Sequence, residues 1–158
     1  MSDVLFRKIT VLDSEVKAPP SGVSIRRAAP DESKLWTKTV SQGFAEHHPV
    51  TQSILDVMEG FFPAAQCFIA SVDGAVAGGA ALSVREGVCG LFGASTLPGF
   101  RGRGVQSALL KARLESAASQ GSDIAVSIAQ PGSVSHRNIE RHGFRVAYTR
   151  TKLIRAVS

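Results

Sequence analysis

The fold of this chain is decided by one stretch of sequence, Thr96-Leu97-Pro98-Gly99-Phe100-Arg101-Gly102-Arg103-Gly104-Val105-Gln106-Ser107-Ala108-Leu109-Leu110. Its glycine-rich first half predicts a loop, and the apolar residues from Val105 onward recur at helical spacing. Glycines permit tight turns, and the first amide N–H groups of a helix have no intrahelical acceptor. A loop that leads into a helix in this way binds anions, phosphate in particular. Arg101 and Arg103 add positive charge, and Ser107 offers a hydroxyl group.

Two familiar phosphate-binding motifs fit this stretch poorly. A Walker loop requires Lys and then Ser or Thr after its second glycine, where Val105 and Gln106 stand. A dinucleotide-binding fingerprint fits the glycine spacing, but Asp123, its candidate ribose-binding acid, precedes the strand that it should follow. Too little chain follows the loop to complete a doubly wound sheet. A dinucleotide-binding oxidoreductase therefore ranks third among the interpretations.

A third motif fits better. Arg101-Gly102-Arg103-Gly104-Val105-Gln106 resembles the pyrophosphate loop of the GNAT acetyltransferase superfamily, Gln/Arg-x-x-Gly-x-Gly/Ala, with Gln106 in place of the final Gly or Ala. The segment 135–144 is similar to the helix of that family that ends in Glu-Lys-x-Gly-Phe, and Gly143 is expected to be its left-handed C-terminal cap. Two markers at this separation make the resemblance specific.

The order of the predicted elements also resembles this family. Strands are expected at 4–12, 23–27, 66–72, 75–84, 88–95, 123–129 and 144–155. Helices are expected to begin near residues 30, 104 and 133, and a further helix carries Ile54, Leu55, Val57 and Met58. The resemblance implies an α/β GNAT fold, a mixed and mostly antiparallel central sheet flanked by helices. We expect residues 1–22 to be an N-terminal extension with a strand and a linker, and 23–158 to be the GNAT domain. The unbroken apolar run at 124–128 predicts burial on both faces.

Composition indicates one globular domain with an anionic ligand. The chain has 158 residues, of which 44% are hydrophobic, and a net charge of +5. The basic residues are not interleaved with aromatic ones, which make up 6%, so no nucleic-acid partner is expected. No apolar run is long enough to span a bilayer, so no membrane association is expected.

The two cysteines and the histidines point to no metal site. Cys67 and Cys89 lie in strand-like segments and are expected to be buried free thiols, which favours a reducing, cytoplasmic location. No signal peptide is expected, because Arg7 interrupts the first apolar run. His47 and His48 are adjacent but have no third ligand at a fitting spacing.

The resemblance implies that acetyl-CoA is the acetyl donor and that a primary amine of a small molecule or peptide attacks it directly in a ternary complex. The loop would hold the pyrophosphate, and strand 88–95 would pair with the pantetheine arm where it splays from the next strand. A backbone N–H near 92–94 would polarise the thioester carbonyl. The expected cofactor-binding residues are Phe92, Gly93, Ala94, Ser95, Thr96, Arg101, Gly102, Arg103, Gly104, Val105, Gln106, Ser107, Ser135 and Asn138.

The acid–base residues depart from the family pattern. Ile139 stands where family members often place a tyrosine that protonates the leaving thiolate, and strand 88–96 contains no carboxylate. Glu46, His47 and His48 lie in the loop that borders the acceptor site by resemblance, and a histidine there is a candidate base.

These departures keep a second function open, a non-catalytic acyl-CoA-binding sensor. The sequence leaves the oligomeric state open, and pairing through the last strands would be an ordinary way for such a domain to form a homodimer. A bulky residue in place of Gly104 is expected to block pyrophosphate binding while sparing the fold.

Overall fold

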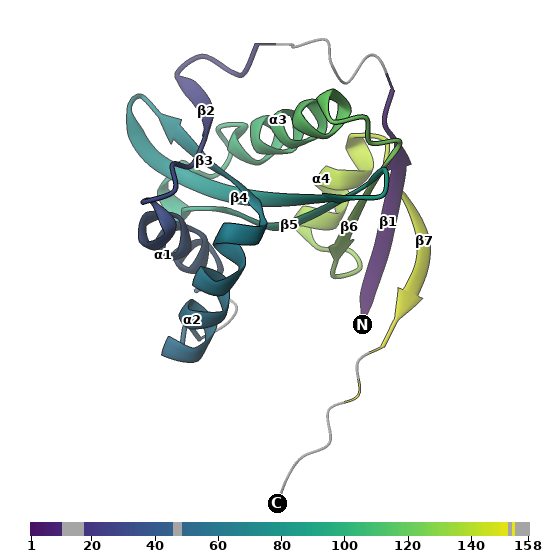
Figure 1. Ribbon diagram of the computed structural model, residues 1–158, viewed down its shortest axis with the longest axis horizontal. Coiled ribbons are helices and arrows are strands. Elements are labelled where there is room, and N and C mark those ends of the chain that lie inside the picture. Colours follow the sequence, from purple (N-terminus) through teal and green to yellow (C-terminus); the bar gives the residue numbers. More distant parts are fainter. Residues whose placement is uncertain (11–17, 46–48, 152, 154–158) are drawn as a thin grey trace, which may run out of the picture.

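The computed structural model describes residues 1–10, 18–45, 49–151 and 153. Its strands form one seven-stranded sheet in the order β2-β3-β4-β5-β6-β1-β7 (Figure 1). The strands are β1 Ser2–Lys8, β2 Val23–Arg27, β3 Gln66–Val72, β4 Ala75–Arg85, β5 Val88–Thr96, β6 Ile124–Ala129 and β7 Arg145–Arg150. The helices are α1 Ser33–Phe44, α2 Gln52–Phe61, α3 Val105–Ser119 and α4 Val134–Arg141, with short 3₁₀ turns η2 Phe62–Ala64 and η3 Pro98–Phe100. The predicted mixed, mostly antiparallel sheet is confirmed, since only β5 and β6 pair in parallel.

Two tight turns connect β3, β4 and β5. Asp73 and Gly74 have φ angles of 50° and 84°, and Glu86 and Gly87 have φ angles of 51° and 77°. Positive φ at both central residues is the signature of the type I′ turn, whose twist matches that of a hairpin. The predicted antiparallel meander is therefore confirmed.

The N-terminal strand lies inside the sheet. The strand expected near residue 4 is present as β1, and it pairs with β6 on one side and with β7 on the other. Residues 1–22 thus contribute a strand to the same sheet as the rest of the chain. Part of the expected linker, residues 11–17, lies outside the described residues.

Helices cover both faces of the sheet, with α1 and α2 on one face and α3 on the other (Figure 1). Trp36 and Val40 of α1 belong to a core cluster with Ile69 of β3. Leu109 and Leu114 of α3 belong to a second, larger cluster that includes residues of β1 to β6, α4 and Phe144. Burial of these apolar side chains is the main favourable contribution to folding.

Strand β6 differs from the prediction. Its residues alternate between buried and partly exposed, and Ile128 is 48% exposed. The predicted burial on both faces is wrong, because Ile124 and Val126 are partly exposed and Ile128, on the same face, is exposed beside a cavity.

The end of α4 follows the prediction closely. Gly143 has a φ of 84°, and its N–H donates to the carbonyl oxygen of Glu140 at 2.9 Å. The N–H of Phe144 donates to Ile139 at 3.4 Å, which completes a Schellman cap with the buried Phe144 side chain as its hydrophobic contact. The strand that follows, β7, is shorter than predicted and ends at Arg150.

Candidate active site

The cleft begins where β5 and β6 part. They pair only from Val88 to Leu91, opposite Ile124 to Ser127, although β5 continues to Thr96. Along β4, Gly79 pairs with Ser95 and Ala81 with Phe92, so β5 carries one extra residue in a bulge. The splayed strand predicted from the sequence is confirmed, and β6 offers no main-chain partner to β5 beyond Leu91.

Two side chains hold the strand pair at this bulge. Trp36 Nε1 donates to the carbonyl oxygen of Ala80 at 3.2 Å. Arg113 Nη1 donates to the carbonyl oxygens of Ala81 at 3.2 Å and Phe92 at 3.5 Å. Burial lowers the pKa of the Arg113 guanidinium to about 10, so it still carries its charge at neutral pH. The bulge is thus held by α1 and by α3.

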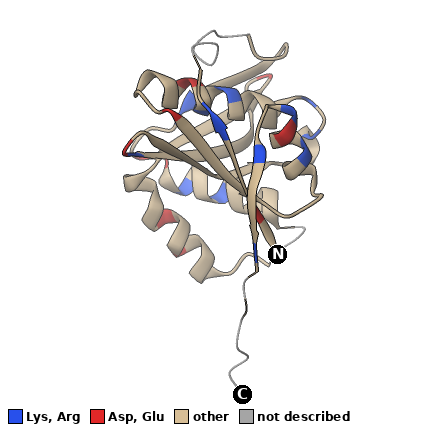
Figure 2. Cartoon of the chain, turned by 90° about the vertical axis from the view of Figure 1, so that its right-hand side faces the viewer, with Lys and Arg blue, Asp and Glu red and all other residues tan. Residues whose placement is uncertain are grey.

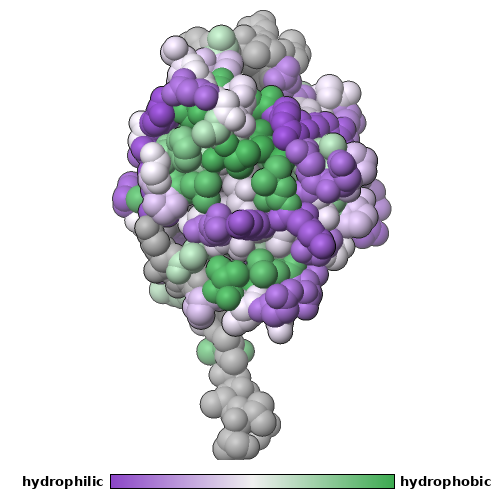
Figure 3. Space-filling view, turned by 90° about the vertical axis from the view of Figure 1, so that its left-hand side faces the viewer, coloured by the Kyte–Doolittle hydropathy of each residue, from purple (hydrophilic) through white to green (hydrophobic). Residues whose placement is uncertain are grey.

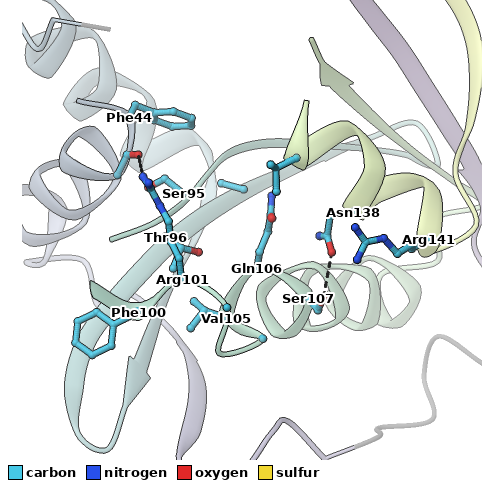
Figure 4. Close-up of a pocket in the computed structure, with 15 residues that line it drawn as sticks. Phe44, Ser95, Thr96, Phe100, Arg101, Val105, Gln106, Ser107, Asn138 and Arg141 are labelled. Atoms are coloured by element: carbon cyan, nitrogen blue, oxygen red, sulfur yellow. Dashed lines mark hydrogen bonds between the residues drawn. The ribbon is translucent and has the colours of Figure 1, made fainter. Parts of the chain in front are cut away.

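Helix α1 approaches β5 closely. Ser95 Oγ donates to the carbonyl oxygen of Val40 at 2.9 Å, and a Cβ atom added to Gly43 would lie 2.4 Å from Ser95 Oγ. Arg101 Nη2 also donates to the carbonyl oxygen of Gly43 at 3.3 Å, near the C-terminal end of α1 (Figure 4). A cation is favourable at a helix C-terminus. The glycine loop is therefore tied to α1.

The predicted loop and helix are confirmed. Gly102 and Gly104 have φ angles of 77° and 79°, and α3 begins at Val105 with Gly104 as its N-cap. No side chain caps this end of α3, so its first amide N–H groups remain available to a ligand. Gly104 to Ser107 line the cleft at this point.

The cleft consists of two adjoining cavities of about 450 and 130 Å³, here called the outer and the inner cavity. The outer cavity is lined by the loop and the start of α3, and the inner one by β5, β6 and α4. All predicted cofactor residues except Arg103 line one or both cavities, namely Phe92, Gly93, Ala94, Ser95, Thr96, Arg101, Gly102, Gly104, Val105, Gln106, Ser107, Ser135 and Asn138. The structure therefore brings them together.

Arg103 lies elsewhere. Its Nη2 forms an ion pair with Asp73 Oδ2 at 2.8 Å, at the hairpin turn between β3 and β4. Because both side chains are well exposed, this ion pair contributes little to stability. Its role toward a cofactor stays a prediction.

Asn138 supplies an unpaired donor in the cleft. Its side chain, 9% exposed, lines both cavities, and its Oδ1 accepts a hydrogen bond from Ser107 Oγ at 3.2 Å (Figure 4). Its Nδ2 is buried and has no hydrogen-bond partner among the described residues. A buried donor without a partner is costly, and this one lies beside the cavities that Asn138 lines.

Substitution at Gly104 affects more than a ligand. A Cβ atom there would lie 2.7 Å from Pro20 Cγ, and the positive φ disfavours any L side chain. A bulky residue at Gly104 therefore requires Pro20 of the N-terminal segment to shift, and the expectation that it spares the fold stays a prediction.

Tertiary packing adds residues that the sequence did not single out. Phe44, Phe100, Val134 and Arg141 line the outer cavity, and Leu91, Leu110, Arg113, Ser127 and Ile128 line the inner one, where Ile139, the position compared with the family's tyrosine, also lies. These residues are scattered along the chain without a motif, and only the fold reveals them. The predicted base candidates Glu46, His47 and His48 lie outside the described residues.

Titratable groups in the described lining are all arginines, namely Arg101, Arg113 and Arg141. The cysteines are buried free thiols, as predicted, and burial raises the pKa of both Cys67 and Cys89 to about 11. Thiols with such pKa values are poor nucleophiles at neutral pH. Within the described part of the chain, no three His, Cys, Asp or Glu residues gather as metal ligands.

The charged residues of the described chain lie on several elements of the fold. Lys and Arg are spread over several helices and strands (Figure 2). Among the helices that the structure describes, none has the length and apolar character to cross a membrane.

This sheet, the parted strands and the glycine loop ahead of α3 define a domain of the acetyltransferase type. Residues 33–144 match the model of the Acetyltransferase (GNAT) family. The match covers more than half of the sequence, and the chain belongs to this family. A search of curated protein sequences gave no match.

Solved structures share the fold. A GCN5-related N-acetyltransferase from Sphaerobacter thermophilus is 18% identical, with 92% of this chain and 48% of that chain covered and a TM-score of 0.70. A GNAT family acetyltransferase from Brucella melitensis, in complex with acetyl-CoA, is 19% identical, with 82% and 91% covered and a TM-score of 0.64. AAC(6')-Iy, in complex with the bisubstrate analogue CoA-S-monomethyl-acetylneamine, is 26% identical, with 84% and 100% covered and a TM-score of 0.62.

Some of the matched proteins are longer. The chain spans between 48% and 60% of the length of the first four solved chains that it matches. The shared part is the GNAT fold predicted from the sequence.

Proposed function

We propose that the chain transfers an acetyl group from acetyl-CoA to a primary amine of a small molecule or peptide, by direct attack in a ternary complex. The observation that carries this proposal is the parting of β5 from β6, with Asn138 lining both cavities of the cleft between them. Acetyl-CoA supplies an activated thioester: transfer forms a C–N bond, breaks the C–S bond and leaves a free thiol, the amine proton passing to sulfur.

The residues of the cleft fit this donor. Arg101 and the uncapped N–H groups at the start of α3 would bind the pyrophosphate. The main chain of β5 from Phe92 to Thr96 would pair with the amides of the pantetheine arm. Asn138 Nδ2 would donate to the same arm or to the thioester. Acetyl-CoA in the Brucella structure and the CoA-containing analogue on AAC(6')-Iy support this proposal.

In this proposal the chain acts mainly by positioning the acetyl donor and the amine. Holding two reactants in line supplies a large part of the acceleration of such a reaction. A backbone N–H of the bulge near Gly93 would polarise the acetyl carbonyl. Ile139 is buried and cannot protonate a thiolate, so the acid role of the family's tyrosine is not carried by this position. Glu46, His47 and His48 stay the candidates for the base.

A sensor that binds acyl-CoA without turnover is the second candidate function. The observation that favours it is the described lining of the cleft, whose titratable residues are arginines alone. Release of free thiol from acetyl-CoA separates the two functions when it is measured over a broad panel of primary amines. Thiol release with any amine supports the enzyme, and tight binding without turnover across the panel supports the sensor.

We also propose that the chain is cytoplasmic and forms a homodimer. The two buried free thiols support a reducing compartment. Strand β7 lies at the edge of the sheet and all its residues are exposed, which leaves its outer side free to pair with a second copy. Light scattering after gel filtration tests the dimer, and a monomer mass at micromolar concentration contradicts it.

A further inference from the structure

Four partly exposed apolar side chains meet at the inner end of the cleft. They come from four elements: Phe44 from α1, Phe61 from α2, Phe92 from β5 and Ile128 from β6, and they are here called the apolar rim. Phe44, Phe92 and Ile128 line the inner cavity, and the rings of Phe61 and Phe92 meet edge to face at 6.4 Å. Their exposed fractions are 40%, 51%, 37% and 48% in that order.

The rim lies at the reacting end of the cleft. The loop lines the outer cavity, while the bulge residues Phe92 and Gly93 line the inner one. The proposed site of the acetyl group is therefore next to the rim. Figure 3, which views the molecule from the side of β2, α1 and α2, shows apolar residues in two areas separated by a hydrophilic band. Apolar surface that gathers beside a cleft marks a binding site.

The charged residues in the described lining of the cleft are all positive. Its charged residues in the described part of the chain are Arg101, Arg113 and Arg141, and none of its described residues is a carboxylate. An acceptor with several ammonium groups needs carboxylates to compensate its desolvation. Both the arginines and the apolar surroundings instead lower the pKa of a single bound amine. They favour the neutral form, which is the nucleophile.

We propose that the acceptor is a monoamine whose amino group is carried by an aromatic or branched aliphatic body without a second positive charge. This proposal rests on the proposed function and names its acceptor class. The apolar body lies against the rim, and its amino group reaches the inner cavity. A free arylalkylamine and the N-terminus of a peptide that begins with an aromatic residue both carry this chemistry.

The test measures amine binding separately from turnover. Calorimetric titrations in the presence of saturating coenzyme A compare 2-phenylethylamine, a tripeptide amide that begins with Phe, and spermidine. Binding of either aromatic amine at least about tenfold tighter than spermidine is expected, as for one well-placed apolar group. The comparison of 2-phenylethylamine with the tripeptide amide shows whether the acceptor is a free amine or a peptide N-terminus. Tighter binding of spermidine, or no binding of either aromatic amine, overturns the proposal.

Substitutions in the apolar rim test where the amine binds. Phe61→Ala and Phe92→Ala are expected to weaken binding of the preferred aromatic amine about fivefold to tenfold, through loss of one aromatic contact. Tyr148→Ala is the matched control, an exposed aromatic residue on β7 that lines neither cavity. Unchanged amine affinity in both rim variants overturns the assignment to the rim. Aromatic-amine binding without thiol release supports the ligand class and overturns the proposed acetyl transfer, so the two failures are distinguishable.

Discussion

Ser107 Oγ lies 3.2 Å from Asn138 Oδ1 and donates a hydrogen bond to it, which joins the first turn of α3 to α4 across the cleft. This bond uses the oxygen of the amide and leaves Nδ2 as a buried donor without a partner. This hydrogen bond therefore joins the first turn of α3 to a residue of α4 that lines both cavities.

Asn138→Asp tests this donor. The substitution keeps the shape of the side chain but removes the N–H donor and adds a negative charge. We expect acetyl-CoA to bind about threefold to tenfold more weakly, the usual cost of one hydrogen bond. Calorimetry gives the dissociation constant, and Ser107→Ala is the companion variant, with a smaller expected loss because Nδ2 is retained. Equal affinities for Asn138→Asp and the unchanged protein would show that Nδ2 does not contact the donor.

The two loop arginines are expected to differ. Arg101 lines the outer cavity, whereas Arg103 is paired with Asp73 outside it. We expect Arg101→Ala to weaken acetyl-CoA binding about tenfold, because a charge-assisted contact to phosphate is lost. Arg103→Ala serves as the matched control and is expected to change the affinity less than twofold. If the same titration showed a larger loss of acetyl-CoA affinity for Arg103→Ala than for Arg101→Ala, Arg103 and not Arg101 would be the phosphate-binding residue.

Arg113 is expected to act through the bulge that it holds. Arg113→Met fills a similar volume but donates to neither Ala81 nor Phe92. The substitution also removes the hydrogen bond from Nε to the carbonyl oxygen of Leu109. Loss of these hydrogen bonds costs about 1–3 kcal/mol, while removal of a buried charge offsets part of that cost. We therefore expect a modest change in the free energy of unfolding but weaker binding of acetyl-CoA. Denaturant unfolding and calorimetry separate the two effects, and an unchanged affinity argues against the positioning role.

Alkaline pH is expected to destabilise the fold through the two thiols. Burial raises the pKa of Cys67 and Cys89 from the ordinary 9.0 to about 11. Between these values the unfolded chain loses thiol protons that the folded chain retains, so stability is present below pH 9 and is lost as the pH rises toward 11. A Cys67→Ala, Cys89→Ala double variant is expected to show a shallower decline in urea unfolding over this range. The same slope in both proteins would mean that other groups cause it.

The sequence predicted the parts of the site that depend on local rules. The glycine loop, the start of α3 and the cap at Gly143 each follow from residue type and spacing, and each is confirmed. The partly exposed face of β6 was missed, because an unbroken apolar run does not reveal which of its residues stay accessible in the folded chain.

Long-range contacts account for the other differences. Two contacts join residues that are far apart in the sequence, Pro20 with Gly104 and Phe61 with Phe92. No sequence motif predicts either contact. The contacts of Arg113 could not be predicted either. Helical spacing places it on the buried side of α3, but it does not reveal which carbonyl oxygens accept its hydrogen bonds.

The most direct measurement is a calorimetric titration of the protein with acetyl-CoA, with NAD as the control ligand and Asn138→Asp as the control protein. We predict saturable binding of acetyl-CoA, no binding of NAD, and weaker binding of acetyl-CoA to the variant. Absence of acetyl-CoA binding would contradict the proposal that the cleft between β5 and β6 holds the acetyl donor.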